Sequence, residues 1–354
     1  MKKTARTLIS AAAVATMALS ACGGSDSPAP SGSASGSSGA PANKTVTILT
    51  HDSWNMDKKV IADFTKKTGY QPKFVSQGDA GALVNQLVLT KDSPLGDVVY
   101  GIDNTFAARA VDEKVLDDYT SPDLPKGVEA MDGQLNPVDK GDVCINADKT
   151  WFAKKKVTVP VTLDDLTKPD YKNLLVVSSP ATSSPGMAFL AATVGAKGED
   201  GWQDYWRQLK ANGVKVDKGW TDAYNVDFSA GEGKGKYPLV LSYSTSPAFT
   251  VSDGESTTSA LLKTCFRQTE YAGVIRGAKN PEGAKAFVDF MQSDEFQSAI
   301  PEQMYMYPIN DAVSLPSDWK KFAPLSPDPI EVSPTTLADK RDTWIKEWTQ
   351  VVQG

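Results

Sequence analysis

Hydrophobic positions in residues 44–354 alternate between two spacings, one typical of β-strands and one typical of helices. Residues 46–50 are rich in β-branched side chains and predict a strand. Val60, Ile61 and Phe64 share one face of a helix predicted over 57–68, which ends at Gly69. The alternation continues with predicted strands at 70–75, 97–102, 174–178, 214–216 and 239–244, and predicted helices at 80–90, 186–194, 201–211, 222–228 and 281–291. Repeated βα units predict an α/β fold with largely parallel sheets.

The N-terminal segment has the pattern of an export signal. Lys2, Lys3 and Arg6 precede an apolar stretch at 8–18 that is too short to span a bilayer as a mature helix. The run Leu-Ser-Ala-Cys that ends at Cys22 resembles the lipobox of bacterial lipoproteins. This resemblance implies cleavage before Cys22 and acylation of that cysteine, which anchors a protein to a membrane without spanning it. The alternative is an ordinary secretory signal peptide with a chance cysteine.

Residues 23–43 predict a flexible linker. They are almost entirely Gly, Ser, Ala and Pro, so they cannot bury enough apolar surface to fold. A coil of this length typically spans about 25 Å. The body at 44–354 is long enough for two lobes, and no other apolar run in the sequence is long enough to cross a membrane.

Charge and the scarcity of histidine exclude several functions. The net charge is −6, so there is no basic surplus to attract a nucleic acid. His51 is the only histidine, which excludes a His-rich zinc site and leaves a Ser-His-Asp triad only that residue. Cys144 and Cys265 remain once Cys22 is acylated, and an even pair in an oxidising compartment predicts a disulfide. Two buried free thiols are the alternative.

Aromatic, hydroxyl and carboxylate side chains follow the predicted strands. Ligands of open α/β sheets bind beyond the carboxyl ends of the strands, so these residues predict a site that stacks a flat ring, balances positive charge and donates hydrogen bonds to an anion. The set comprises His51, Asp52, Ser53, Trp54, Asp103, Asn104, Thr182, Ser183, Ser184, Trp220, Tyr224, Tyr243 and Ser244. Helix capping is the alternative for Asp103–Asn104 and Thr182–Ser184, and buried packing is the alternative for Trp220.

Six blocks in order resemble the thiamine-binding solute receptors of bacterial thiamine ABC importers. They lie at 50–53, 101–104, 182–186, 218–224, 239–247 and 299–308, and the similarity extends from about residue 45 to the helix that carries Trp344 and Trp348. The resemblance implies a two-lobed periplasmic-binding-protein fold with two chain crossovers at a hinge. It implies a receptor rather than an enzyme, which captures thiamine or its phosphates and delivers them to a membrane permease driven by an ATPase.

The resemblance also assigns roles within the site. Trp220, Tyr243 and Tyr305 would line the ring site. By their own chemistry, Asp52 or Asp103 would neutralise the thiazolium or accept from the pyrimidine amine. Ser183 and Ser184 precede a helix start, so their hydroxyls and the first amides would hold the hydroxyethyl or phosphate end. Neither a metal nor a cofactor is expected.

Two positions depart from the family, in which Tyr stands at position 51 and Trp is common at position 305. A neutral imidazole is expected at His51, since protonation would add a like charge beside the ligand cation. If His51 lines the pocket, thiamine affinity should then fall below about pH 6.

Other functions stay open at this point. A receptor of the same fold for ferric ion usually relies on adjacent tyrosines, and the sequence has no Tyr-Tyr pair. Receptors for a polyamine or a thiamine-related pyrimidine would also use aromatic and acidic residues. An exported enzyme is a further alternative, but the sequence has no recognisable nucleophile elbow. A purely structural surface protein is another, and it would show no ligand-induced stabilisation.

The expected organisation is a monomer on the extracytoplasmic face of the membrane. Lobe 1 is expected at 44–138 with 267–311, lobe 2 at 139–266, and a C-terminal segment at 312–354 that packs across the body. Cys144 and Cys265 would then lie beside the two crossovers.

Overall fold

The computed structural model describes residues 44–354. The predicted signal peptide, the acylated Cys22 and the linker lie outside the described residues. Within the described part, no helix combines the length and the apolar character that crossing a membrane requires.

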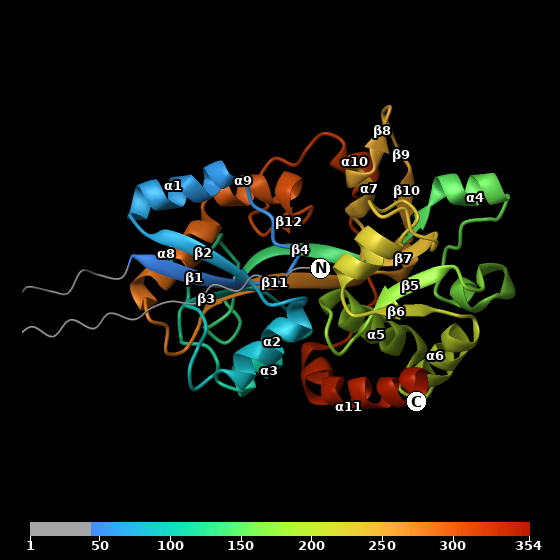
Figure 1. The fold of residues 1–354 in the computed structure, drawn as a ribbon, viewed down its shortest axis with the longest axis horizontal. Helices are drawn as coiled ribbons and strands as arrows, with labels where there is room; N and C mark the ends of the chain where they lie inside the picture. The colour runs from blue at the N-terminus through green and yellow to red at the C-terminus, as the bar shows by residue number, and fades with distance from the viewer. Residues whose placement is uncertain (1–43) are drawn as a thin grey trace, which may run out of the picture. The chain divides into compact units, whose positions relative to one another are not determined.

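A single mixed sheet runs through the body (Figure 1). The spatial order is β2 (Gln71–Ser76), β1 (Thr45–Thr50), β3 (Val98–Asp103), β11 (Phe266–Val274), β4 (Asn136–Asp148), β7 (Leu239–Tyr243), β5 (Leu175–Ser178) and β6 (Lys215–Asp217). Parallel pairs form both ends of the sheet, β2–β1–β3 at one and β7–β5–β6 at the other, as the alternating pattern predicts. In the middle, β11 and β4 pair antiparallel with each other and with the strands on either side.

Two short strands and a small hairpin complete the strand pairing. β10 (Thr258–Ala260) and β12 (Tyr307–Pro308) pair with β4. β8 (Val251–Ser252) and β9 (Glu255–Ser256) pair with each other outside the main sheet.

Helices cover both faces of the β2–β1–β3 end. Val46 and Ile48 of β1 join an apolar cluster with Phe64 and Phe287, whereas Leu49 joins a different cluster with Leu83. Successive strand side chains point to opposite faces, so a strand buried on both faces must be apolar almost throughout. The first cluster involves α1 (Lys58–Thr68), α8 (Pro281–Gln292) and α9 (Asp294–Gln303), and the second α2 (Ala80–Leu89) and α3 (Ala107–Asp112).

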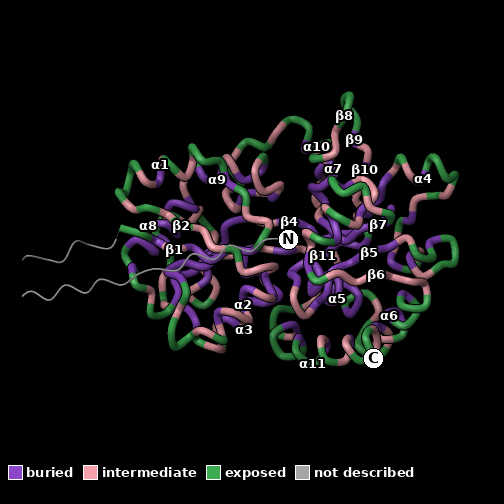
Figure 2. Tube along the Cα trace, viewed as in Figure 1, coloured by how far each residue is buried: buried purple, intermediate pink, exposed green. Residues whose placement is uncertain are grey.

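The opposite end of the sheet packs on an aromatic core. Every residue of α5 (Ser184–Lys197) from Ser184 to Val194 is buried (Figure 2). Trp206 of α6 (Trp202–Ala211) contacts Trp348 of α11 (Pro334–Gln353) edge to face, with ring centroids 5.5 Å apart. Gly186 is required near the start of α5, because a Cβ there would lie 2.5 Å from the carbonyl oxygen of Ser179. The remaining helices are α4 (Lys149–Lys155), α7 (Ser246–Phe249), α10 (Trp319–Phe322), a π-helix at Asp222–Asp227 and 3₁₀ turns at Asp164–Thr167, Pro169–Tyr171 and Leu262–Thr264.

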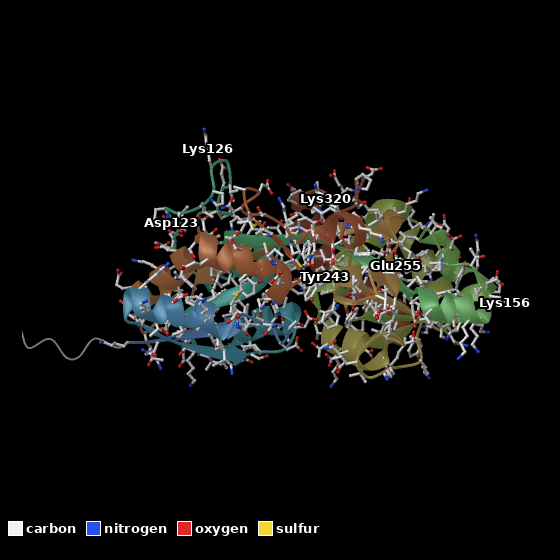
Figure 3. All side chains as sticks on the ribbon, turned by 90° about the horizontal axis from the view of Figure 1, so that it is seen from above. Asp123, Lys126, Lys156, Tyr243, Glu255 and Lys320 are labelled. Carbon is white, nitrogen blue, oxygen red and sulfur yellow. A yellow bond between two sulfur atoms is a disulfide. The ribbon has the colours of Figure 1, made fainter. Side chains whose placement is uncertain are left out.

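The disulfide and the C-terminal helix connect distant parts of the chain. Cys144 of β4 is bonded to Cys265, which directly precedes β11. α11 carries Arg341, whose guanidinium lies 4.1 Å from the ring centroid of Phe106 beside α3, while Trp348 packs on α6. Tyr243, the last residue of β7, lies near the middle of the body (Figure 3).

Candidate ligand-binding site

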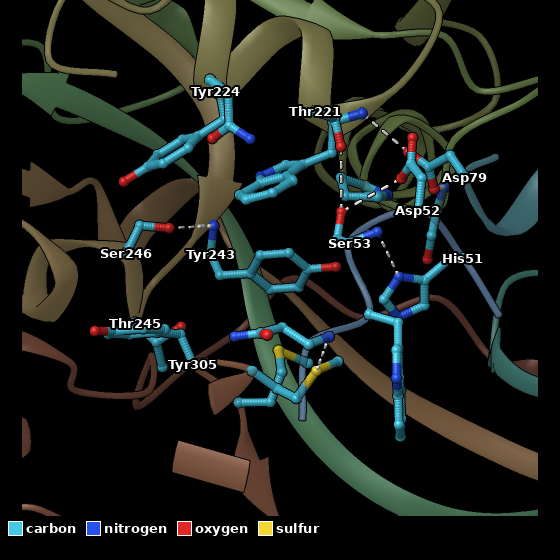
Figure 4. A pocket seen from close by; sticks show the side chains of 18 of the residues that line it. His51, Asp52, Ser53, Asp79, Thr221, Tyr224, Tyr243, Thr245, Ser246 and Tyr305 are labelled. Atoms are coloured by element: carbon cyan, nitrogen blue, oxygen red, sulfur yellow. Dashed lines mark hydrogen bonds between the residues drawn. The ribbon is translucent and has the colours of Figure 1, made fainter. Parts of the chain in front are cut away.

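A cavity of about 450 Å³ opens where the segments after β1, β6 and β7 meet the N-termini of α2 and α5. Figure 4 shows its wall from close by. The segment between α9 and β12 closes another side with Met304, Tyr305 and Met306. The sequence-predicted residues that line the cavity are His51, Asp52, Ser53, Trp54, Ser184, Trp220, Tyr224, Tyr243 and Tyr305.

Stacked aromatic rings form one wall. The indole of Trp220 lies parallel to the ring of Tyr224, with centroids 4.9 Å apart and an interplanar angle of 11°. Trp220 Nε1 donates to Ser242 Oγ at 2.9 Å, which fixes the indole plane. Tyr243 meets the same indole edge-on at 6.5 Å. The π-helix that carries Tyr224 orients this pair, and π-helices frequently occur at functional sites.

Tyr305 lies on another part of the wall in a constrained conformation. Its backbone φ is 54°, the left-handed region that non-glycine residues rarely adopt. Its ring contacts Phe249 edge to face, with centroids 5.2 Å apart. Such strain persists only where the surroundings hold it, and it is concentrated at functional sites.

The charge of the cavity wall is negative. Asp52, Asp79, Glu232 and Glu270 line it, and no lysine or arginine is among its described lining residues. A positive charge placed among these carboxylates is favoured, whereas an anion finds no basic partner in the wall. The wall therefore suits a flat, cationic ligand.

Asp79 connects the two sides of the cavity. Its carboxylate accepts from the backbone N–H of Ala80 at 2.7 Å, Ser184 at 3.0 Å and Trp220 at 2.9 Å. Ala80 begins α2, whereas Ser184 begins α5 and Trp220 follows β6. Burial raises the pKa of Asp79, which the three amides partly offset. A second contact joins the same sides, since Ser53 Oγ lies 3.3 Å from Thr221 Oγ1.

A buried acidic pair lies beneath the aromatic wall on β4 and β11. The hydroxyl of Tyr100 lies 2.5 Å from Asp139 Oδ2 and 3.0 Å from Glu270 Oε2. Gln268 Nε2 donates to Glu270 Oε1 at 2.9 Å. Burial and the adjacent Glu270 raise the pKa of Asp139 well above its usual value. Burial also acts to raise the pKa of Glu270, but His51 lowers it below its usual value, so Glu270 carries the negative charge of the pair.

His51 faces Glu270 from the end of β1. Its Nε2 lies 3.7 Å from Glu270 Oε2, and its Nδ1 accepts from the Ser53 backbone N–H at 3.1 Å. Gly101 makes room for the imidazole, because a Cβ there would lie 2.2 Å from the ring. Burial lowers the pKa of His51, but Glu270 outweighs this and raises it above 6.5. This direction differs from the expected neutral imidazole, because the prediction did not include a carboxylate on β11.

Five of the sequence-predicted residues do not line the cavity. Asp103 caps the turn before α3 by accepting from Thr105 and Phe106, and burial raises its pKa to about 6. Ser184 also donates to Asp103 from the α5 side. The other four lie in supporting positions. Asn104 bonds to the backbone of β11, Thr182 Oγ1 donates to the carbonyl of Lys218, Ser183 caps α5, and Ser244 is fully buried.

Asp79 and Glu270 are lining residues that the sequence analysis missed. Asp79 comes three residues after β2, so the rule that was applied to the other strand ends identifies it. Glu270 has no such signal, since it lies inside a strand that the hydrophobic pattern did not predict. Further lining residues were not among the predicted site residues, although Thr221, Thr245 and Ser246 lie in the segments that follow predicted strands. They include Asn55, Thr221, Asn225, Glu232, Thr245, Ser246 and Phe249.

Among residues 44–354, no group of three or more His, Cys, Asp or Glu side chains is arranged to hold a metal ion. Asp52, Asp79 and Glu270 instead face separate backbone amides, hydroxyls and the imidazole.

Known proteins are similar to this chain in both sequence and fold. The chain is 31% identical over 322 residues to the thiamine-binding periplasmic protein of Salmonella typhimurium, covering 88% of this chain and 94% of that protein. It is 30% identical to the thiamine-binding periplasmic protein of Escherichia coli over 323 residues, with the same coverage. A solved structure of a periplasmic thiamin binding protein matches with a TM-score of 0.77 at 28% identity, over 87% of this chain and 96% of that one.

One further structure illustrates how widely the fold is used. A ferric binding protein from Campylobacter jejuni matches with a TM-score of 0.70 at 19% identity, over 86% of this chain and 99% of that one, which shows the fold alone. The profile of the bacterial extracellular solute-binding protein family matches residues 93–330. The chain therefore belongs to the family of bacterial extracellular solute-binding proteins.

Proposed function

We propose that this protein is an extracytoplasmic receptor that captures thiamine or its phosphates and delivers them to an ABC importer. One observation carries the proposal: the cavity combines stacked aromatic rings with four carboxylates and has no lysine or arginine among its described lining residues. Thiamine joins a flat aminopyrimidine to a cationic thiazolium. The names of the relatives that are about 30% identical point to the same ligand.

Each part of thiamine has a counterpart in the wall. A cation over an aromatic face gains about 0.5–2 kcal/mol, and Trp220 and Tyr243 offer such faces. Carboxylates balance the thiazolium and accept from the pyrimidine amine. The hydroxyethyl arm, with or without phosphate, would meet the hydroxyls of Thr221, Thr245 and Ser246.

Two lobes that close over the ligand fit this role. We place lobe 1 at 44–138 with 267–311 and lobe 2 at 139–266, with 312–354 packing across them. The crossovers then fall on β4 and β11, which lie in the middle of the sheet. Asp79 and the Ser53–Thr221 contact would hold the closed form together.

Asp79→Asn should weaken thiamine binding about tenfold. One carboxylate oxygen is replaced by an NH2 group in asparagine, so a backbone N–H that has an acceptor in the parent protein faces a donor in the variant. Losing a buried hydrogen bond to a charged group costs about 1–3 kcal/mol. Isothermal titration of the variant measures the change. Asp57→Asn is the matched control, because Asp57 caps α1 and does not line the cavity. Equal affinity of both variants and the parent protein would show that Asp79 does not stabilise the bound form.

Direct titration tests the proposed ligand. Thiamine, its monophosphate, its diphosphate, spermidine and ferric ion are titrated into the purified protein by calorimetry, and the melting temperature is recorded with each. A true ligand at a hundredfold excess over its dissociation constant stabilises the fold by about 2.7 kcal/mol. An absence of heat and of any melting shift with every thiamine form rules out the proposed ligand. An assay for thiamine turnover distinguishes a receptor from an enzyme.

The same proposal includes a membrane tether and a transport complex. We propose that Cys22 is acylated, that the linker holds a monomeric body near the membrane, and that a permease with its ATPase receives the ligand. Mass spectrometry of protein extracted from membranes should find a lipid-modified N-terminal cysteine. An unmodified mature N-terminus at another residue contradicts this part of the proposal.

A further inference from the structure

The cavity wall contains one group that can exchange a proton near neutral pH. His51 is the only histidine in the chain, and 8% of its surface is exposed. Its buried Nε2 makes no hydrogen bond to a described residue but lies 3.7 Å from Glu270 Oε2. Both residues line the cavity. The carboxylate of Glu270 therefore faces both the imidazole and the cavity.

The other ring nitrogen of His51 is held by the turn that follows β1. Nδ1 accepts from the Ser53 N–H, and only an imidazole without a hydrogen on Nδ1 can make this contact, so the contact favours the neutral form with its hydrogen on Nε2. Protonation would place a hydrogen on Nδ1 opposite that of the Ser53 amide. The bond to Ser53 must then break, which loosens the turn that holds Asp52 and Ser53 in the wall.

The groups around His51 are mostly acidic. Glu270 on β11 is the closest of them, and Asp52 and Asp79 add negative potential from the adjacent loops. Tyr100 on β3 packs against the imidazole with ring centroids 5.5 Å apart. Further titratable groups around Glu270 are Asp103 on β3, Asp139 on β4 and Tyr243 on β7. In an empty cavity these acidic groups favour a proton on His51 and oppose the effect of the Ser53 contact, and a cation in the cavity disfavours that proton.

We propose that a proton on His51 and the positive charge of the ligand compete for Glu270, so that binding of a cationic ligand releases this proton to solvent. The inference rests on the proposed thiamine ligand and deepens it by assigning Glu270 as the partner of the thiazolium. His51 is a positioning residue, because its neutral form holds the turn at 51–53. The ligand-bound state then has a neutral imidazole and an intact bond from Ser53.

The sign of the pH dependence follows from this exchange. Binding that releases a proton becomes tighter as the pH rises. Between the pKa of His51 in the complex and its higher pKa in the free protein, affinity should rise about tenfold per pH unit. Below and above that interval, affinity should be independent of the protonation of His51. The decrease in affinity on acidification then begins above pH 6.5, since Glu270 raises the pKa of free His51.

The first test follows the imidazole itself by NMR. Because untagged protein has one histidine, a single C2–H resonance reports its titration without further assignment. We expect a pKa above 6.5 in the free protein, a lower pKa with thiamine bound, and a lower pKa in free Glu270→Gln. A pKa that is unchanged by both thiamine and the substitution would overturn the inference.

The second test counts protons during binding. Thiamine is titrated at several pH values in buffers with different ionisation heats, using the parent protein and His51→Gln. Glutamine can still accept from Ser53 and donate to Glu270 but does not titrate. The readout for this variant is therefore how steeply its thiamine affinity changes with pH, rather than the affinity itself. We expect proton release and a steep slope only in the parent protein. Identical slopes and proton counts would refute the competition, and this test stands if Glu270→Gln does not fold.

The two proposals can fail separately. If thiamine gives no heat with either protein, the proposed ligand is wrong, and the NMR comparison of the free parent protein with Glu270→Gln still tests the pair. If thiamine binds both proteins with the same pH profile, the receptor function holds and the proton exchange is refuted.

Discussion

Trp220→Ala should weaken thiamine binding by about 2 kcal/mol or more, which is roughly thirtyfold in the dissociation constant. The indole is the central ring of the wall, since it stacks on Tyr224 and meets Tyr243. Truncation removes the face on which the ligand ring would lie. Ser242 keeps a partner in the variant, because its Oγ lies 2.7 Å from Ser246 Oγ, so the loss should appear in binding rather than in folding.

Two further variants isolate the contribution of the indole. Trp220→Phe keeps a smaller aromatic face and should give an intermediate affinity. Trp151→Ala is the matched control, because Trp151 lies on α4 against Phe152 and does not line the cavity. Calorimetric titration and melting curves of all three variants are compared with the parent protein. An affinity of Trp220→Ala that equals that of Trp151→Ala would exclude ligand stacking on this indole.

Replacing both Cys144 and Cys265 by alanine should lower the free energy of unfolding by about 4–5 kcal/mol. The bond closes a loop with a sequence separation of 121 residues, and in the chain-entropy model a loop near this length loses that much freedom in the unfolded state. Both cysteines are fully buried, so alanine avoids placing an unpaired hydroxyl in the core. Denaturant unfolding of the double variant measures the loss.

A neighbouring substitution separates the crosslink from the packing. Ile145→Val removes one buried methyl beside Cys144 and should cost about 0.5–1.5 kcal/mol. A double-cysteine variant no less stable than Ile145→Val would show that the crosslink contributes little. Mass spectrometry of the exported protein is the second check, because two free thiols would remove the basis of this prediction altogether.

The sequence predicted most outer elements but missed the two central strands. The predictions for β1, β2, β3, β5, β6 and β7 agree with the structure to within one residue at each end. Strands β4 and β11 were missed because polar residues interrupt their apolar pattern. Asn136, Asp139 and Asp142 of β4 are fully buried, and Asp142 is satisfied by Arg267 and by the amide of Ser326.

The site was predictable where it follows outer strands and was not predictable elsewhere. The segment at 51–54, Trp220 and Tyr243 all line the cavity, because the carboxyl ends of neighbouring strands meet at one edge of the sheet. Thr182 and Ser183 follow a strand as well, yet they bond to Lys218 and Ser178 and support the wall from behind. Position after a strand locates a residue near the site but does not fix the direction of its side chain.

The sequence by itself determined the α/β architecture, the lack of a basic surplus, the cysteine pair and the supply of aromatic and acidic side chains. These features follow from local spacing and composition, which act along the chain. Only the tertiary structure decided that Glu270 faces His51 and that Asp79 joins α2 to Ser184 and Trp220. Each of these contacts joins residues more than 100 positions apart, and their geometry depends on how the strands pair, which local patterns do not encode.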